Sequence, residues 1–136
     1  MREMKTQDIH LPRVLLIDED ASFAAVYEAA LVRAGFRPSL ARDADSAKQA
    51  VSQFDFAVIV TEVLLPGRNG LRLIQDLRLD TRLAETPILI VTVLEAADVG
   101  LYASLRESLG IKHYLVKQKI RPTQLVEAVR SVVSVK

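Results

Sequence analysis

The chain has 136 residues, half of them hydrophobic, which suits one domain with one core. Its 18 basic residues are balanced by 17 acidic ones, and this net charge of +1 argues against a nucleic-acid or anionic-membrane partner. There is no cysteine, which excludes a disulfide framework, a zinc–thiolate site and a thiol nucleophile. The polar start lacks the apolar core of a signal peptide, and no apolar run approaches the roughly 20 residues that span a bilayer, so we expect a cytoplasmic protein.

The chain opens with a polar stretch that leads into a buried strand. Residues 1–11 are interpreted as a tail, and residues 12–136 as one domain. The continuous apolar run at 14–17 predicts a strand that is covered on both faces. A helix is predicted at 20–34, where the apolar positions at helical spacing are Phe23, Val26, Tyr27, Ala30 and Leu31.

The next strand, at 36–41, is weaker. It contains Pro38, which cannot donate a ladder hydrogen bond and therefore favours the edge of a sheet. A helix follows at 43–53, and Asp43 or Asp45 is suited to cap its start. The second half of the chain repeats the alternation, with strands and helices predicted in turn at 56–61, 69–79, 87–93, 96–109, 113–116 and 122–133.

Five strand–helix units of this kind predict an α/β fold, with a parallel sheet covered by helices on both faces. Right-handed crossovers and a weak second strand suit the flavodoxin-like (βα)5 arrangement, in which the strands lie in the order 2-1-3-4-5. In such a sheet the site lies beyond the carboxyl ends of strands 1 and 3, where the direction of winding reverses.

Polar residues occur at this end of four predicted strands. They are Asp18, Glu19 and Asp20 after the first strand, Glu62 after the third, Thr92 near the end of the fourth and Lys117 after the fifth. Clustered carboxylates repel one another unless a cation intervenes. Lys117 can supply that charge, and so can Mg²⁺, which typically binds one or two carboxylates and keeps several waters.

Each of these residues also has a simpler explanation. The acidic run at 18–20 can cap the following helix, Thr92 can be an ordinary β-branched strand residue, and Lys117 can lie on the surface. Glu62 is harder to explain in this way, because a charge at the end of a buried strand needs a partner. The chain has no phosphate-binding loop, dinucleotide fingerprint or nucleophile elbow. A flavin site, which this fold class allows, lacks aromatic residues in the strand-end loops.

Four stretches, VLLIDED, VIVTEVLLPGRNG, PILIVT and HYLVK, together resemble the receiver (CheY-like) domain of bacterial two-component response regulators. The resemblance covers about residues 13–134 and implies the (βα)5 fold. It also implies a signalling module rather than an enzyme. Such a module accepts a phosphoryl group from a histidine kinase onto an aspartate at the end of strand 3, with the help of Mg²⁺.

The resemblance assigns roles by position. Glu62 falls at the phosphoacceptor position, and Asp18 and Glu19 match the acidic pair near the metal, so these three residues are the expected Mg²⁺ ligands. Thr92 matches the hydroxyl residue that responds to phosphorylation. Lys117 matches the lysine that pairs with the acceptor and its phosphoryl group.

Tyr114 matches the aromatic switch residue of the family, whereas four other positions depart from the family pattern. Glu62 replaces the acceptor aspartate, and Glu19 stands where aspartate is commoner. Val93 is larger than the residue that usually follows the hydroxyl position, which hinders access to the acceptor. Gln118 replaces a proline that often has a cis bond. A cis bond without proline costs roughly 2.5–4 kcal/mol, so we expect a trans bond there.

The extra methylene of Glu62 bears directly on function. Phosphoryl transfer depends mostly on positioning, and a misplacement of about 1 Å can cost on the order of 10²-fold in rate. The same displacement moves the carboxylate toward the place of a phosphoryl group, within reach of Lys117 or Thr92. Three interpretations stay open: a pseudo-receiver that partly imitates the phosphorylated state, an inert interaction domain, and a Mg²⁺-dependent phosphate-accepting switch whose acceptor Asp is replaced by Glu.

The glutamate is either natural or engineered, and Val93 and Gln118 favour natural divergence. Mg²⁺ binding is expected to be weak or absent. The expected partner is a histidine kinase or a downstream signalling protein. A homodimer is a second expected possibility, and its interface would be the face made by helix 96–109, strand 113–116 and helix 122–133. Neither direct nucleic-acid contact nor membrane contact is expected.

Overall fold

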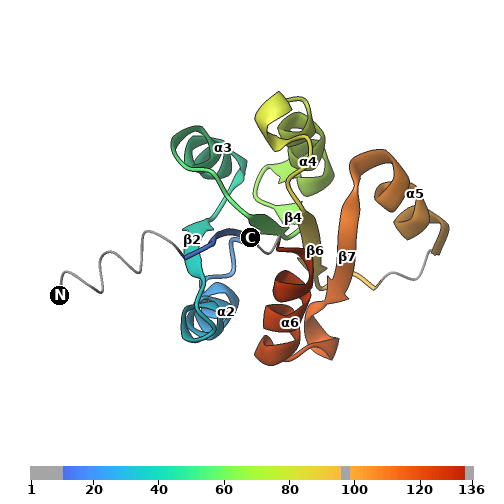
Figure 1. The fold of residues 1–136 in the computed structure, drawn as a ribbon. Helices are drawn as coiled ribbons and strands as arrows, with labels where there is room; N and C mark the ends of the chain where they lie inside the picture. Colours follow the sequence, from blue (N-terminus) through green and yellow to red (C-terminus); the bar gives the residue numbers. More distant parts are fainter. Residues whose placement is uncertain (1–10, 96–98, 134–136) are drawn as a thin grey trace.

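A computed structural model of the chain describes residues 11–95 and 99–133 (Figure 1). The strands are β1 (Arg13–Ile17), β2 (Arg37–Ala41), β3 (Val58–Thr61), β4 (Leu64–Leu65), β5 (Arg68–Asn69), β6 (Ile88–Thr92) and β7 (Ile111–Val116). The helices are α2 (Ala21–Arg33), α3 (Ala44–Gln53), α4 (Gly70–Arg78), α5 (Val99–Leu109) and α6 (Pro122–Val132), with the 3-10 turns η1 (Thr81–Leu83) and η2 (Lys117–Lys119). The predicted helix start at Ala96 and nearly all of the predicted tail at 1–11 lie outside the described residues.

Five parallel strands form the sheet in the order β2-β1-β3-β6-β7. Counted along the main sheet, this is the predicted order 2-1-3-4-5, so the flavodoxin-like fold is confirmed. Pro38 lies on β2 at the edge of the sheet, where its missing N–H leaves no gap in a central ladder. In Figure 1, α2 and α6 lie on one side of the sheet, while α3 and α4 lie on the other.

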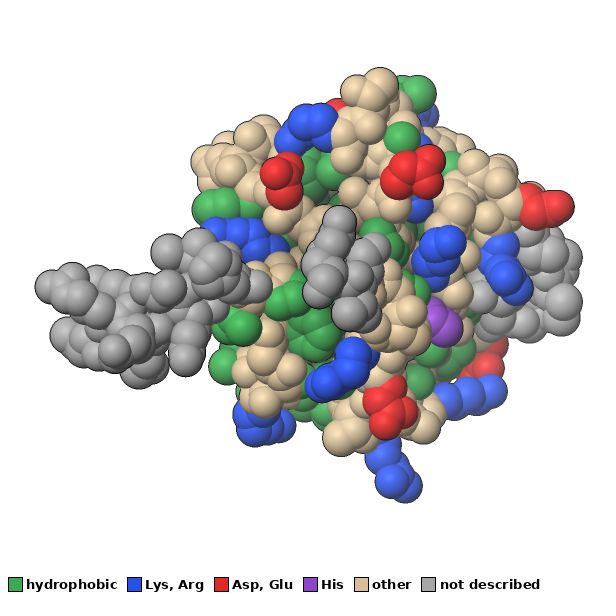
Figure 2. Space-filling view, viewed as in Figure 1, with side chains coloured by type: hydrophobic (Ala, Val, Ile, Leu, Met, Phe, Trp, Pro, Cys, Tyr) green, Lys and Arg blue, Asp and Glu red, His purple; other side chains and the backbone are tan. Residues whose placement is uncertain are grey.

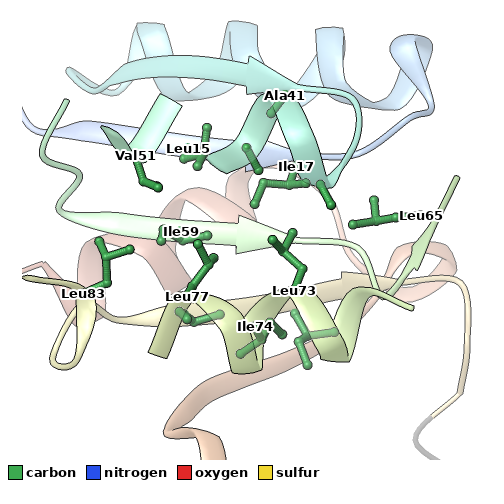
Figure 3. Close-up of a cluster of buried hydrophobic side chains, with 14 of the residues drawn as sticks. Leu15, Ile17, Ala41, Val51, Ile59, Leu65, Leu73, Ile74, Leu77 and Leu83 are labelled. Atoms are coloured by element: carbon green, nitrogen blue, oxygen red, sulfur yellow. The ribbon is translucent and has the colours of Figure 1, made fainter. Parts of the chain in front are cut away.

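Each face of the sheet has its own hydrophobic cluster. Leu15 and Ile59 pack with side chains of α3 and α4 (Figure 3), and Ile90 of β6 and Leu105 of α5 belong to the same cluster. Val14 and Val60 point to the opposite face and pack with side chains of α2 and α6. Successive strand residues are therefore buried on alternate faces, which explains why the strand sequences are continuous apolar runs rather than alternating ones.

Side chains at the helix starts fix where the helices begin. Asp20 accepts a hydrogen bond from the Phe23 N–H at 3.1 Å and caps α2. Of the two predicted caps for α3, Asp43 is the one used, and it accepts from the Ser46 N–H at 2.8 Å. The assignment of Val26 to the apolar face of α2 was wrong. This side chain is 53% exposed, because only the side of α2 that faces the sheet is covered.

A short hairpin between β3 and α4 was not predicted. Strands β4 and β5 are joined by Pro66 and Gly67, and the positive φ of 65° at Gly67 suits a type II turn. Gly70 then brings the start of α4 against the end of β3. A Cβ atom at Gly70 would lie 2.6 Å from Val63 Cα and 2.7 Å from Glu62 O. The absence of a side chain at this position therefore lets α4 support the backbone at Glu62.

The surface carries no single-sign charge field on the side drawn in Figure 2, where basic and acidic side chains are interspersed. This mixture agrees with the nearly balanced composition of the chain. Within the described residues, no helix has the length and apolar character required to cross a membrane.

Candidate functional site

Four polar residues predicted for the site do meet at one end of the sheet. Asp18 follows β1, Glu62 follows β3, Thr92 ends β6 and Lys117 follows β7. The Glu62 N–H donates to the carbonyl oxygen of Ile17 at 2.9 Å, which sets the two acidic residues on adjacent strands. Asp18, Glu62 and Thr92 are all buried. Their burial calls for internal partners, because a buried charge without one is costly.

Lys117 is the cation that both carboxylates share. Its Nζ lies 2.6 Å from Asp18 Oδ2 and 3.1 Å from Glu62 Oε1, and the side chain is only 10% exposed. Burial alone lowers the pKa of Lys117, but hydrogen bonds and charges from Asp18 and Glu62 outweigh it, so the pKa is raised above its ordinary value. Lys117 therefore stays protonated and offsets part of the negative charge of the cluster.

The second carboxylate oxygen of Glu62 turns back onto its own backbone. Oε2 accepts hydrogen bonds from the N–H groups of Val63 at 2.8 Å and Leu64 at 3.1 Å. The longer side chain thus reaches donors on both sides, and each of its oxygens is occupied. The expected contact with Lys117 is present. A hydrogen bond to Thr92 is absent among the described residues.

Thr92 and Tyr114 act on the loop after β6 instead. Thr92 Oγ1 accepts from the Leu94 N–H at 3.3 Å, and the Tyr114 hydroxyl donates to the Leu94 carbonyl at 3.0 Å. Burial raises the pKa of Tyr114, and the charges of Glu62 and Glu95 raise it further. The Tyr114 hydroxyl therefore holds the loop after β6, and the charge of Glu62 contributes to its raised pKa.

Two residues that the sequence did not single out as loop contacts tie the same loop to the end of β7. Gln118 Nε2 donates to the Val93 carbonyl at 3.1 Å, and Lys119 Nζ lies 2.9 Å from Glu95 Oε1. As expected, the bond before Gln118 is trans, since the described residues contain no cis peptide. The Val93 side chain is largely exposed. Two departures from the family pattern, Val93 and Gln118, thus meet through one hydrogen bond.

The predicted metal ligands do not form a cation site in this arrangement. Asp18 Oδ1 accepts from the Asp20 N–H at 2.9 Å, its other oxygen contacts Lys117, and both oxygens of Glu62 are engaged. Glu19 is exposed. Across the described part of the chain, no three acidic or histidine side chains gather closely enough to hold a metal ion. Mg²⁺ binding stays a prediction.

An aromatic side chain completes the surroundings of Lys117. The Phe23 ring centroid lies 4.2 Å from Lys117 Nζ, and the ring of Tyr27 lies behind Phe23 with the two centroids 4.2 Å apart. Burial raises the pKa of Tyr27, while the charge of Lys117 opposes this shift. The sequence indicated only that both residues lie on the apolar face of a helix. No feature of the pattern marked Phe23 as part of the site.

Comparison with known proteins supplies the family. A profile of the response regulator receiver domain matches residues 14–130. Protein PetR of Rhodobacter capsulatus is 40% identical over 81 residues, which cover 60% of this chain and 33% of PetR. The DNA-binding response regulator MtrA of Mycobacterium tuberculosis is 32% identical over 120 residues, which cover 88% of this chain and 49% of MtrA. The chain therefore spans half or less of the length of these curated relatives.

Solved structures support the same assignment. The chemotaxis response regulator CheY4 of Vibrio cholerae aligns with a TM-score of 0.79 at 24% identity, over 90% of this chain and 99% of CheY4. A response regulator from Chloroflexus aurantiacus aligns with a TM-score of 0.78 at 27% identity, over 90% of this chain and 97% of the other. At such identities the solved structures show the fold, and the profile match shows the family. The chain belongs to the receiver domain family of two-component response regulators.

Proposed function

We propose that this receiver domain is a pseudo-receiver, which signals by binding other proteins and does not accept a phosphoryl group. The observation that carries the proposal is the state of Glu62 at the acceptor position. One oxygen contacts Lys117 at 3.1 Å, and the other accepts two backbone hydrogen bonds. The Lys117 contact and the two backbone hydrogen bonds fix the carboxylate in one orientation, so turning it in line with a phosphoryl donor would cost these interactions.

Geometry adds to this cost. Phosphoryl transfer needs the nucleophile in line with the leaving group, and a misplacement of about 1 Å can lower the rate on the order of 10²-fold. The extra methylene of Glu62 moves its carboxylate outward relative to an aspartate on the same backbone.

The same contacts suit partial imitation of a phosphorylated receiver. The carboxylate of Glu62 engages Lys117, the residue that the family uses for the phosphoryl group, but it brings one negative charge where a phosphoryl group brings nearly two. Tyr114 and Gln118 each hold the loop after β6 by a hydrogen bond. We infer that the domain rests in a conformation shifted toward the active form, and that the imitation is incomplete.

A second candidate is a phosphate-accepting, Mg²⁺-dependent receiver in which glutamate replaces the acceptor aspartate. The observation in its favour is that Asp18, Thr92 and Lys117, to which the resemblance assigns family roles, lie after β1, at the end of β6 and after β7. Their presence means that the rest of the site could support transfer if the acceptor were restored. The two candidates therefore differ mainly in what Glu62 itself can do.

The proposed partners are a histidine kinase or a downstream signalling protein of a two-component system in the cytoplasm. A homodimer through the face of α5, β7 and α6 is a further proposal, and we assign the domain no enzymatic activity of its own. MtrA is named as a DNA-binding regulator. For this domain we propose no direct nucleic-acid contact, which agrees with its net charge of +1 and with the mixed charges seen in Figure 2.

NMR can test the active-like bias. Amide spectra would be recorded for the wild type, for Glu62→Gln, and for Glu62→Asp with and without beryllium trifluoride and Mg²⁺, a stable mimic of the phosphoryl group on aspartate. We expect wild-type signals of the loop after β6 to lie between the two Glu62→Asp states, and the Glu62→Gln signals to shift toward the untreated state. Wild-type signals that coincide with untreated Glu62→Asp would instead identify an inert interaction domain.

A further inference from the structure

The Phe23 ring is a third partner of the Lys117 ammonium, beside the two carboxylates. The ammonium is bounded by Asp18 and Glu62, and the Phe23 ring lies with its centroid 4.2 Å from Nζ. Phe23 and Tyr27 are four residues apart on α2 and therefore lie on the same side of the helix. Tyr27 is buried and packs against Phe23, which fixes the ring in place from behind.

The space beneath the cluster leaves little room for water. A cavity of about 10 Å³ is lined by Asp18, Glu62, Phe23 and Tyr27 among others, and this volume is at the lower limit for a single water molecule. The packing on this side of the cluster is therefore tight, with room for one water molecule at most. A cation over an aromatic face is attracted by the ring, and the attraction grows when the cation is desolvated, as Lys117 is.

We propose that Phe23, supported by Tyr27, is a positioning residue that holds the Lys117 ammonium between Asp18 and Glu62 when no phosphoryl group is present. An aliphatic side chain of similar size fills the same space but offers no attraction to a cation. The inference deepens the proposed function, on which it rests, because it names what keeps the lysine committed to Glu62. The role depends on the aromatic face of Phe23 and not only on its volume.

The test observes the lysine itself. Lysine ammonium signals are recorded by ¹⁵N NMR in metal-free buffer containing EDTA, and the Lys117 signal is assigned by its loss in Lys117→Arg. The rate at which its protons exchange with water is then measured in Phe23→Tyr, which keeps the ring, and in Phe23→Leu and Phe23→Met, which do not. Phe36→Leu is the matched control, because Phe36 is buried in the same hydrophobic cluster and lies under Arg130 instead.

We expect wild type and Phe23→Tyr to show a slowly exchanging Lys117 ammonium. In Phe23→Leu and Phe23→Met the exchange should be about 5- to 30-fold faster, with far-UV circular dichroism unchanged. Phe36→Leu should leave the rate unaltered. An unchanged rate in both aliphatic variants would overturn the proposal, and so would an equal acceleration in Phe36→Leu, which would indicate general loosening. Phosphoryl labelling of the wild type would contradict the proposed function but not these rates, so the two failures are distinguishable.

Discussion

Replacement of Lys117 by methionine should destabilise the fold by removing the shared cation of the site. Methionine keeps most of the length of the stem but leaves Asp18 and Glu62 buried without their common partner. Both carboxylates lie within 3.1 Å of Nζ, and both are less than 10% exposed. Removing one partner of a buried ion pair costs about 3–5 kcal/mol. The short backbone hydrogen bonds to both carboxylates remain, so we expect a loss near the lower limit, about 3 kcal/mol at pH 7.

The assay is urea unfolding followed by far-UV circular dichroism, because the chain has no tryptophan. Lys119→Met is the matched control, since Lys119 pairs with Glu95 on the surface at 66% exposure and such a pair contributes about 0–1 kcal/mol. In Lys117→Met the two carboxylates repel each other without a cation between them, so the second change Glu62→Gln should recover part of the loss at pH 7.

The reasoning would be refuted if Lys117→Met lost no more stability than Lys119→Met. The double variant gives a second check, since failure of Glu62→Gln to recover any stability would mean that the two carboxylates do not repel each other once Lys117 is gone.

Three further outcomes follow from the structure. Because the pKa of Lys117 is raised on folding, Lys117 contributes its full stabilisation below the pKa of an unfolded lysine, about 10.4. This stabilisation is lost as the pH rises through the pKa of the folded state. Urea titrations should therefore show the wild type losing its stability advantage over Lys117→Met only above about pH 10. In the same assay, Arg78→Met should lower the free energy of unfolding by about 3 kcal/mol. Arg78 donates three hydrogen bonds of 2.7–2.8 Å to backbone carbonyls, and each contributes about 1 kcal/mol. A loss of stability under about 1 kcal/mol would contradict this role. Gly70→Ala should lower the free energy of unfolding by about 3 kcal/mol, because the added Cβ would overlap the backbone of Glu62 and Val63. Gly67→Ala should lower it by only about 1 kcal/mol, because the added Cβ meets open space and only the positive φ is strained. Equal melting temperatures for the two variants would contradict this difference.

The fold was accessible from the sequence because the sheet is buried on both faces. Runs such as those of β1 and β6 are continuous, which is typical of strands that are buried on both faces of a parallel sheet. Pro38 predicted the edge strand of the sheet, because proline has no N–H to donate to a neighbouring strand. The β4–β5 hairpin escaped prediction because strands of two residues carry no periodicity. There, Pro66 and Gly67 indicated a turn but not the pairing around it.

The sequence also predicted which residues come together at the candidate site. Parallel strands place their carboxyl ends at one edge, so residues that follow them meet whatever their rotamers. The contacts within the site depend on side-chain conformation, which no spacing encodes. Three contacts are of this kind: the two hydrogen bonds that Glu62 Oε2 accepts, the contact of the Phe23 ring with Lys117, and the hydrogen bond from Gln118 to the loop after β6. Val26 shows the converse, because helical spacing alone did not reveal which side of α2 is covered.

Intact-mass measurement after incubation with acetyl phosphate and Mg²⁺ tests the central claim most directly. Wild type and Glu62→Asp are treated side by side. We predict that the wild type gains no phosphoryl mass and that Glu62→Asp does, since Asp18, Thr92 and Lys117 are otherwise in place. If neither protein is labelled, the site is disabled beyond Glu62 and only the interaction role remains. A phosphoryl group on the wild type would contradict the pseudo-receiver account.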